Sequence, residues 1–187
     1  MGMTVRKMRD TQTPCVIMHK VADVRGGVSV KTSELAGDYL SEGTPISKPQ
    51  NGICHVIKIA VVNEKASESA TEVKVSKGTL FNVGDAVFVK EGAKAAKITK
   101  IDRKAKDADV LTISEAIGAL EKGATIVEAK EEGDSATLKY EPFAIVGTGQ
   151  PISPKSNVNT DAWIIAVTKG NNLPLCVEEK LKGIINY

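Results

Sequence analysis

Short β-forming runs separated by glycine-containing turns constrain this sequence more than any other feature. From Thr71 the stretch TEVKVS alternates between apolar and polar residues, and turn residues such as Gly84-Asp85 punctuate the region that follows. Alternation with period two, bounded by turns, is typical of strands with one buried face. Four further strands are expected in this region, at Ala86–Lys90, Lys94–Asp102, Asp109–Ser114 and Thr125–Ala129.

Helical periodicity is scarce in the rest of the chain. Ser33–Leu40 could form one or two helical turns capped by Ser33, although Gly37 weakens this interpretation. Ser114–Leu120 could form a single turn, and Leu175–Ile184 either a short amphipathic helix or part of an extended arm. Many short strands, frequent glycine turns and little helix predict an all-β fold, β-rich with one to three short helices.

One phrase occurs twice in the sequence. Gly43–Val62 and Gly149–Thr168 both begin with Gly-x-Pro-Ile-Ser. A stretch rich in proline and asparagine follows in each, and each ends in an apolar run. Proline fixes φ and lacks an N–H, so each copy should enter a strand at its edge or first residue. One hypothesis is that the two copies pair in one sheet system, with Ile57 in contact with Ile164. The alternative is that two separate hairpins use the same turn chemistry.

The pairing hypothesis implies a small barrel-like β module inserted in a β scaffold. Residues 1–34 would form an N-terminal arm and the first strands, residues 35–70 and 137–187 the scaffold, and residues 71–136 the module. Aromatic residues make up only 4% of the chain, so the cores should be aliphatic. The expected core residues of the module are Val87, Val89, Ile98, Ile101, Leu111, Ile113, Ile126 and Val127.

Composition excludes several classes of protein. The chain has 187 residues, 42% of them hydrophobic, which suits a globular protein with one sizeable core or two small ones. A net charge of +2 is too small to suggest a nucleic-acid partner. No apolar run is long enough to span a membrane, and no signal peptide is expected. The three cysteines, Cys15, Cys54 and Cys176, are far apart, so buried free thiols in a reducing compartment are expected.

The sequence offers few residues for catalysis. Cys54 and His55 are neighbours in an expected strand, so their side chains should point to opposite faces and cannot form a dyad. Ser135 lies in a charged loop without an oxyanion-donor turn, and Asp102, Asp107 and Asp109 fit a solvated hairpin turn better than a calcium loop. We therefore predict a protein that is not an enzyme, with no catalytic, cofactor-binding or metal-binding residues and no cofactor.

The region from Gly78 onward resembles a known family. GTLFNVGDAVFVKEG, followed by AAKITKIDRKAKDADVLTISEAIGALEKGATI, is similar to a module of tailed-bacteriophage head proteins. The flanks YLSEGTPISKPQNGICHVIKIAVV and PFAIVGTGQPISPKSNVNTDAWIIAV are similar to those of head fibre or head decoration proteins of phages and prophages. The resemblance covers roughly residues 35–187 and rests on turn signals and strand patterns, with no site residues to transfer.

The resemblance implies a virion structural protein that binds the outer capsid surface. Its partner would be the lattice of the major capsid protein, and it would be synthesised in the host bacterial cytoplasm. A homotrimer is expected, because repeated binding to a lattice favours oligomeric symmetry. The candidate contacts between copies are Val5–Val16 and Leu173–Tyr187, whose apolar residues need cover. Alternatively, the C-terminal tail folds back on its own β core.

Two other classes of function compete with this interpretation. A non-catalytic carbohydrate- or cell-surface-binding β module would need an exposed aromatic residue, and Trp163 lies in an apolar run that favours a core position. An enzyme of an unrecognised type would need a pocket that joins His19, His55 and a carboxylate.

Overall fold

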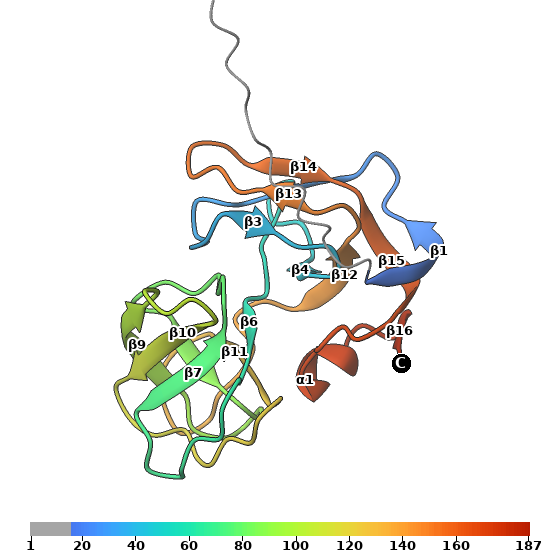
Figure 1. The fold of residues 1–187 in the computed structure, drawn as a ribbon. Coiled ribbons are helices and arrows are strands. Elements are labelled where there is room, and N and C mark those ends of the chain that lie inside the picture. Colours follow the sequence, from blue (N-terminus) through green and yellow to red (C-terminus); the bar gives the residue numbers. More distant parts are fainter. Residues whose placement is uncertain (1–15) are drawn as a thin grey trace, which may run out of the picture.

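The computed structural model describes residues 16–187, whose regular structure is almost entirely β. One short helix, α1 (Leu175–Glu178), is present among these residues, so the prediction of an all-β fold is confirmed. Within the same range, no helix has the length and apolar character needed to cross a membrane. Figure 1 shows two β bodies, which we call the scaffold and the module.

The scaffold is built from three small sheets. Its largest sheet has the order β1-β15-β12-β4, and β16 also pairs with β15, in parallel. The bounds of these strands are β1 (Ile17–Asp23), β4 (Pro45–Ser47), β12 (Pro142–Val146), β15 (Ala162–Thr168) and β16 (Ile184–Asn186). The smaller sheets pair β14 (Val158–Thr160), β2 (Val28–Val30) and β5 (Ile53–Cys54), and β13 (Gln150–Pro151) with β3 (Tyr39–Leu40).

The module is one six-stranded antiparallel sheet of order β6-β11-β8-β9-β10-β7. Its strands are β6 (Ile59–Val61), β7 (Glu72–Ser76), β8 (Ala86–Phe88), β9 (Ala96–Asp102), β10 (Ala108–Ile113) and β11 (Thr125–Ala129). The two outer strands meet at one end, where Val62 forms a bridge with Val75, but they do not pair along their length, so the curved sheet is open and does not close into a barrel. The sheet begins with β6, before residue 71.

Three hydrophobic clusters hold these bodies together. The module core lies inside the curved sheet and includes Phe81, Leu111 and Leu120. The scaffold core includes Val30, Leu40 and Ile46. The joint core contains residues of both bodies, among them Ile17, Phe88, Val127, Ile145 and Val177. The module is therefore packed against the scaffold through a shared hydrophobic cluster.

Most of the expected core residues of the module are buried. Val87, Ile98, Leu111, Ile113, Ile126 and Val127 are almost fully buried, whereas Val89 and Ile101 are partly buried at the margin of the module core. Ile126 and Val127 are adjacent and yet both buried, because β11 is covered on both faces. Ile126 belongs to the module core and Val127 to the joint core.

Replacing Ile113 with alanine is expected to destabilise the chain by about 2–5 kcal/mol, because Ile113 is 3% exposed within the module core. Chemical denaturation of the two proteins measures the difference. The partly buried Ile101 is the matched control, and Ile101→Ala should cost less. Equal effects at the two positions would contradict the packing of β10 in this core.

The repeated phrase does not form two equivalent hairpins in one sheet. The first apolar run contributes β5 and β6 to two different sheets, and the second forms β15 in a third sheet. Ile57 belongs to the joint core, while Ile164 packs against the scaffold core. The two apolar runs therefore do not pair with each other as the hypothesis required, although β4 of the first copy and β15 of the second belong to the same scaffold sheet. The two prolines also differ, since Pro45 is buried in β4 and Pro151 is exposed in β13.

Two of the three expected helical segments are not helical. The chain makes turns within Ser33–Leu40 and Ser114–Leu120, where Gly37 and Gly118 have φ values of 95° and 99°. These left-handed conformations end a right-handed helix. The C-terminal segment forms α1 and then β16, so it folds back on the β core of its own chain, with Val177 and Leu181 in the joint core.

Candidate functional site

Cys54 and His55 point to different environments, as expected for neighbours in an extended segment. Cys54 is fully buried in the scaffold core. The Nδ1 atom of His55 lies 2.5 Å from a carboxylate oxygen of Glu34, and its ring stacks on Tyr140 with centroids 4.4 Å apart. Burial raises the pKa of the Cys54 thiol, which is the opposite of what a nucleophile requires. The two side chains therefore do not form a nucleophile and base pair.

The described cysteines are expected to resist modification. Cys54 and Cys176 are both free and buried, and burial raises the pKa of each thiol. We expect a thiol reagent to label neither until the chain unfolds, because the thiolate is the reactive form. Rapid labelling of both in the native protein would contradict this expectation. Cys15 lies outside the described residues.

The remaining candidate residues are exposed and lie on different elements. His19 is exposed on β1, and Ser135 is exposed in the loop after β11. Among residues 16–187, no group of three or more histidine, cysteine, aspartate or glutamate side chains is placed to hold a metal ion.

The prediction that Asp102, Asp107 and Asp109 form a solvated hairpin turn is wrong for Asp109. It is fully buried at the start of β10, where its carboxylate accepts hydrogen bonds from the N–H groups of Gly78 and Thr79 at 3.0 and 3.1 Å. Lys77 Nζ donates to the other oxygen at 2.9 Å. Asp109 alternates with Leu111 and Ile113, and this spacing placed it on the buried face of the strand. The carboxylate fixes the turn that precedes Leu80.

A buried charge network lies where the chain passes between the two bodies. Lys58, before β6, contacts Asp85 at 2.6 Å and Glu128 at 3.2 Å, and Lys139, before β12, contacts the same oxygen of Glu128 at 2.7 Å. Both Lys58 and Glu128 are 2% exposed. The other oxygen of Glu128, Oε2, is buried and has no hydrogen-bond partner among the described residues. Glu128 thus links Lys58, on the segment that enters the module, to Lys139, on the segment that leaves it.

Glu128 should give the stability of the chain a distinctive pH dependence. Burial raises the pKa of its carboxyl, although Lys58 and Lys139 act in the opposite direction. Between the ordinary and the raised pKa, the folded chain holds a proton that the unfolded chain has released. The free energy of unfolding therefore contains a contribution that falls as pH rises through this window. Glu128→Gln removes that contribution, so the variant should gain stability relative to the native chain as pH rises. Denaturation at several pH values measures this difference, and Glu121→Gln, which removes a carboxylate from an exposed ion pair with Lys65, is the control.

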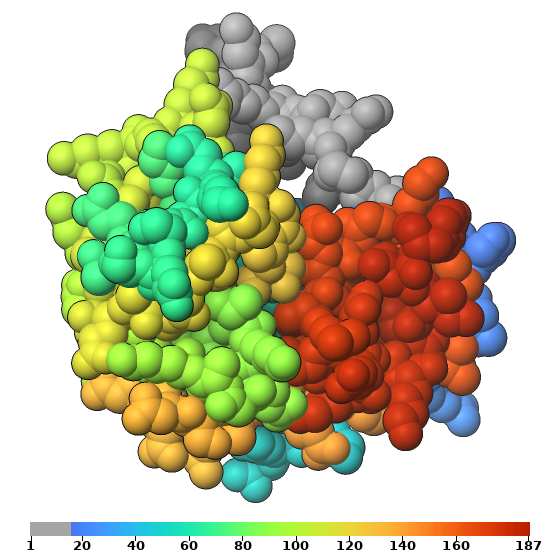
Figure 2. Space-filling model, turned by 90° about the horizontal axis from the view of Figure 1, so that it is seen from below, coloured from blue at the N-terminus to red at the C-terminus, as the bar shows by residue number. Residues whose placement is uncertain are grey.

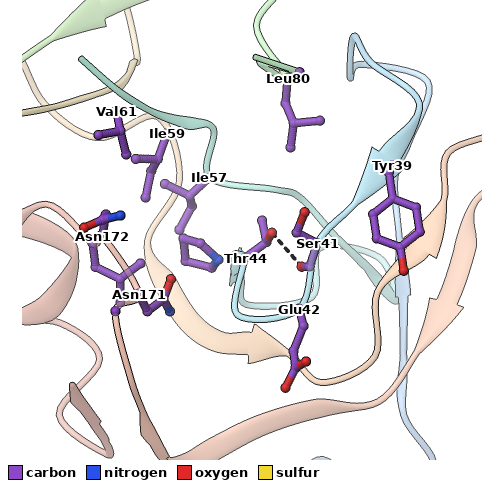
Figure 3. Close-up of a pocket in the computed structure, with 14 residues that line it drawn as sticks. Tyr39, Ser41, Glu42, Thr44, Ile57, Ile59, Val61, Leu80, Asn171 and Asn172 are labelled. Carbon is purple, nitrogen blue, oxygen red and sulfur yellow. Dashed lines mark hydrogen bonds between the residues drawn. The ribbon is translucent and has the colours of Figure 1, made fainter. Parts of the chain in front are cut away.

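A groove of about 340 Å³ separates the two bodies (Figure 3). Ile57, just before β6, and Ile59 and Val61 within β6 form its floor, and Leu80 of the module lies across from them. Polar groups surround this floor, from Tyr39, Ser41 and Thr44 on one side and Asn171 and Asn172 on the other. An apolar floor with a polar margin, at a boundary between two bodies, is the usual character of a binding site.

A second surface lies on the outer side of the scaffold. We call it the scaffold face, and it consists of Ile165, Val167, Ile185 and Tyr187. Ile185 pairs with Val167, and alternate residues of a strand share one face, so these side chains point the same way. Ile165, Ile185 and Tyr187 are 43%, 62% and 67% exposed. Figure 2 shows the C-terminal segment, in red, as a continuous surface beside the module. The scaffold face thus exposes three large apolar side chains, beside His19, which pairs with Val167, and Lys169, which lies over the ring of Tyr187.

Trp163 does not belong to either surface. It is half-buried against the joint core, and its indole N–H donates to Asp161 at 3.1 Å. Lys20 lies over the ring, 5.2 Å from its centroid. These contacts fix the indole within the scaffold.

Comparisons of this chain with protein-family models, with curated proteins and with solved structures found no match.

Proposed function

We propose that this chain is a virion structural protein, a phage head fibre or head decoration protein that binds the outer surface of a capsid. The resemblance of residues 35–187 to such proteins suggests the class. The observation that carries the proposal is the scaffold face, with Ile185 62% exposed beside Ile165 and Tyr187. Apolar side chains gathered on one sheet suit contact with a protein lattice.

Cosedimentation with capsid shells tests the proposal. The shells are assembled from the major capsid protein encoded in the same genome, and the full chain is mixed with them and pelleted. The native chain should pellet with the shells, and Ile185→Lys should weaken binding by about tenfold or more, because it places a charge in the apolar contact. Val83→Lys is the matched control, since Val83 is 61% exposed on the module. A native chain that stays in the supernatant would overturn the proposal.

A homotrimer is part of the same proposal. Among the described strands, the edge strand β1 pairs only with β15, and association of copies covers a free sheet edge of this kind. Light scattering of the full chain should give three times the mass of one chain. A monomer at micromolar concentration would contradict a trimer in free solution.

A carbohydrate- or cell-surface-binding module is the second candidate, and the groove favours it. Tyr39 is 41% exposed at the groove, on the same side as the hydroxyl of Ser41 and opposite the amide of Asn172. Aromatic rings and amides of this kind stack on and hydrogen-bond sugars. Binding to a printed array of saccharides, lost on Tyr39→Ala, would favour this function over the capsid.

A further inference from the structure

Lys58 lies between two carboxylates in the buried charge network. Its Nζ atom is 2.6 Å from Oδ2 of Asp85 and 3.2 Å from Oε1 of Glu128. Lys58 and Glu128 are almost fully buried, and the side chain of Asp85 is only 14% exposed. Keeping an ammonium group and a carboxylate away from water is costly, and the attraction between them offsets only part of that cost. A reaction that removes both charges would therefore be favoured at this position.

The order of the strands in the module brings the three groups together, since β11 lies between β6 and β8. Lys58 directly precedes β6, Asp85 directly precedes β8, and Glu128 lies in β11. The N–H of Glu128 donates to Lys58 O at 3.0 Å, which aligns the two segments. Alternate residues of a strand share one face, so Asp85 lies on the face of Val87 and Glu128 on that of Ile126, both in the module core. The sheet thus holds the amine and the acid beside Glu128.

Asp85 is fixed in contact with the amine. Its Oδ2 atom also accepts a hydrogen bond from the N–H of Asn82 at 2.8 Å, which holds the carboxylate in the turn before β8. The carbon that carries this oxygen, Cγ, is one bond away from the atom that Nζ contacts. Lys58 and Asp85 are 27 residues apart in the chain, and the folded sheet keeps their side chains together. Holding two reactants in such contact raises their effective concentration by many orders of magnitude.

Glu128 is placed to move protons during such a reaction. Its Oε1 atom contacts Nζ of Lys58 and accepts a hydrogen bond from Lys139 at 2.7 Å. Its Oε2 atom is buried and has no hydrogen-bond partner within residues 16–187, and an unpaired polar atom of this kind calls for an explanation. Burial raises the pKa of the Glu128 carboxyl, so the folded chain readily holds a proton there. A protonated carboxyl group beside a reacting amine can act as a general acid and base.

We propose that Lys58 and Asp85 form an intramolecular isopeptide bond, with Glu128 as the catalytic residue. A proton first passes from the ammonium group to the carboxylate, which gives an amine and a carboxylic acid. Nζ then attacks Cγ, while Glu128 accepts a proton from the nitrogen and donates one to the departing hydroxyl group. One C–N bond forms, one C–O bond breaks and one water molecule leaves. Nothing is oxidised or reduced, so no further reactant is needed.

The surroundings of the three residues allow the water to leave. A cavity of about 400 Å³ is lined by Asp85 and Glu128 together with the exposed residues Lys97, Glu131 and Glu132. The resulting amide is uncharged and links the segments before β6 and β8 across β11. The proposal does not depend on the proposed function, because it concerns a bond within one chain.

Mass spectrometry of the intact, denatured full chain tests this proposal. The native chain should be lighter than its sequence by one water molecule, and a tryptic digest should contain a branched peptide that joins the segments around Lys58 and Asp85. Lys58→Met and Asp85→Ala should each have the full mass of their sequences. Glu128→Gln keeps both reacting groups, so it should still form the bond, but about a hundredfold more slowly. Its mass, followed over days after purification, measures that rate.

Lys65 and Glu121 are the internal control, since their charged groups are also 2.6 Å apart but their side chains are 68% and 70% exposed. No branched peptide should join them. A native chain with its full sequence mass would overturn the proposal. Loss of water that persists in Lys58→Met would also overturn it, because Asp85 would then have closed on the backbone as a succinimide. If Glu128→Gln reacted as fast as the native chain, Glu128 would not be the catalytic residue.

Discussion

Replacing Asp109 with alanine is expected to destabilise the chain by about 3–5 kcal/mol, the range for removing one member of a buried ionic network. The substitution leaves the N–H groups of Gly78 and Thr79 without their acceptor inside the protein. Lys77 also loses its partner, and Asp109 is fully buried, so water cannot replace the carboxylate without opening the turn. Urea denaturation measures the loss.

The pH dependence of this effect has a definite sign. Burial alone would raise the pKa of Asp109, but the hydrogen bonds from Lys77, Thr79 and Gly78 hold it below its ordinary value. The contribution of Asp109 is therefore complete above the ordinary carboxyl pKa and is lost as pH falls through the lowered value. The difference between native chain and variant should shrink only in strong acid.

Asp107→Ala is the control for this substitution, because Asp107 is exposed in the same hairpin. Its effect should stay within about 0.5 kcal/mol, as is usual for surface positions. If both aspartates gave equally small effects, the turn before Leu80 would not depend on the buried carboxylate.

The strands were predictable because their signal is local. Alternation placed β9, β10 and β11 within two residues of their observed ends, and it required no knowledge of which strand pairs with which. The failed helix predictions at Ser33–Leu40 and Ser114–Leu120 have a local cause too, since the glycines in them adopt positive φ. The sequence contained that signal at Gly37 and Gly118, but a capping serine suggested a helix instead.

The binding surfaces were not predictable in the same way. The groove is lined by residues that are distant in the sequence, among them Tyr39, Leu80 and Leu173. That arrangement depends on contacts between residues far apart in the sequence. The burial of Asp109 could have been inferred, since it occupies the same face as Leu111 and Ile113. Its lysine-rich neighbours suggested solvent instead.

The division into module and scaffold also looked different from the sequence. The sequence predicted an inserted module with a core of its own, and the module does have such a core. However, β8 is covered on both faces: Val87 points into the module core and Phe88 into the joint core. Phe88 therefore belongs to a cluster that also contains Ile145 and Val177 of the scaffold.

Replacing Phe88 with alanine should consequently destabilise the whole chain, by about 3–5 kcal/mol, because it leaves a large cavity at a fully buried position between the two bodies. Thermal unfolding should show one transition at a lower temperature, since loss of the joint core affects both bodies together. Val83→Ala, at an exposed apolar position on the module, should leave the transition almost unchanged. Two separate transitions, of which only one shifts in Phe88→Ala, would mean that module and scaffold unfold independently. A single shifted transition would instead show that the shared hydrophobic cluster makes the two β bodies one cooperative unit, which keeps the groove between them in a fixed shape.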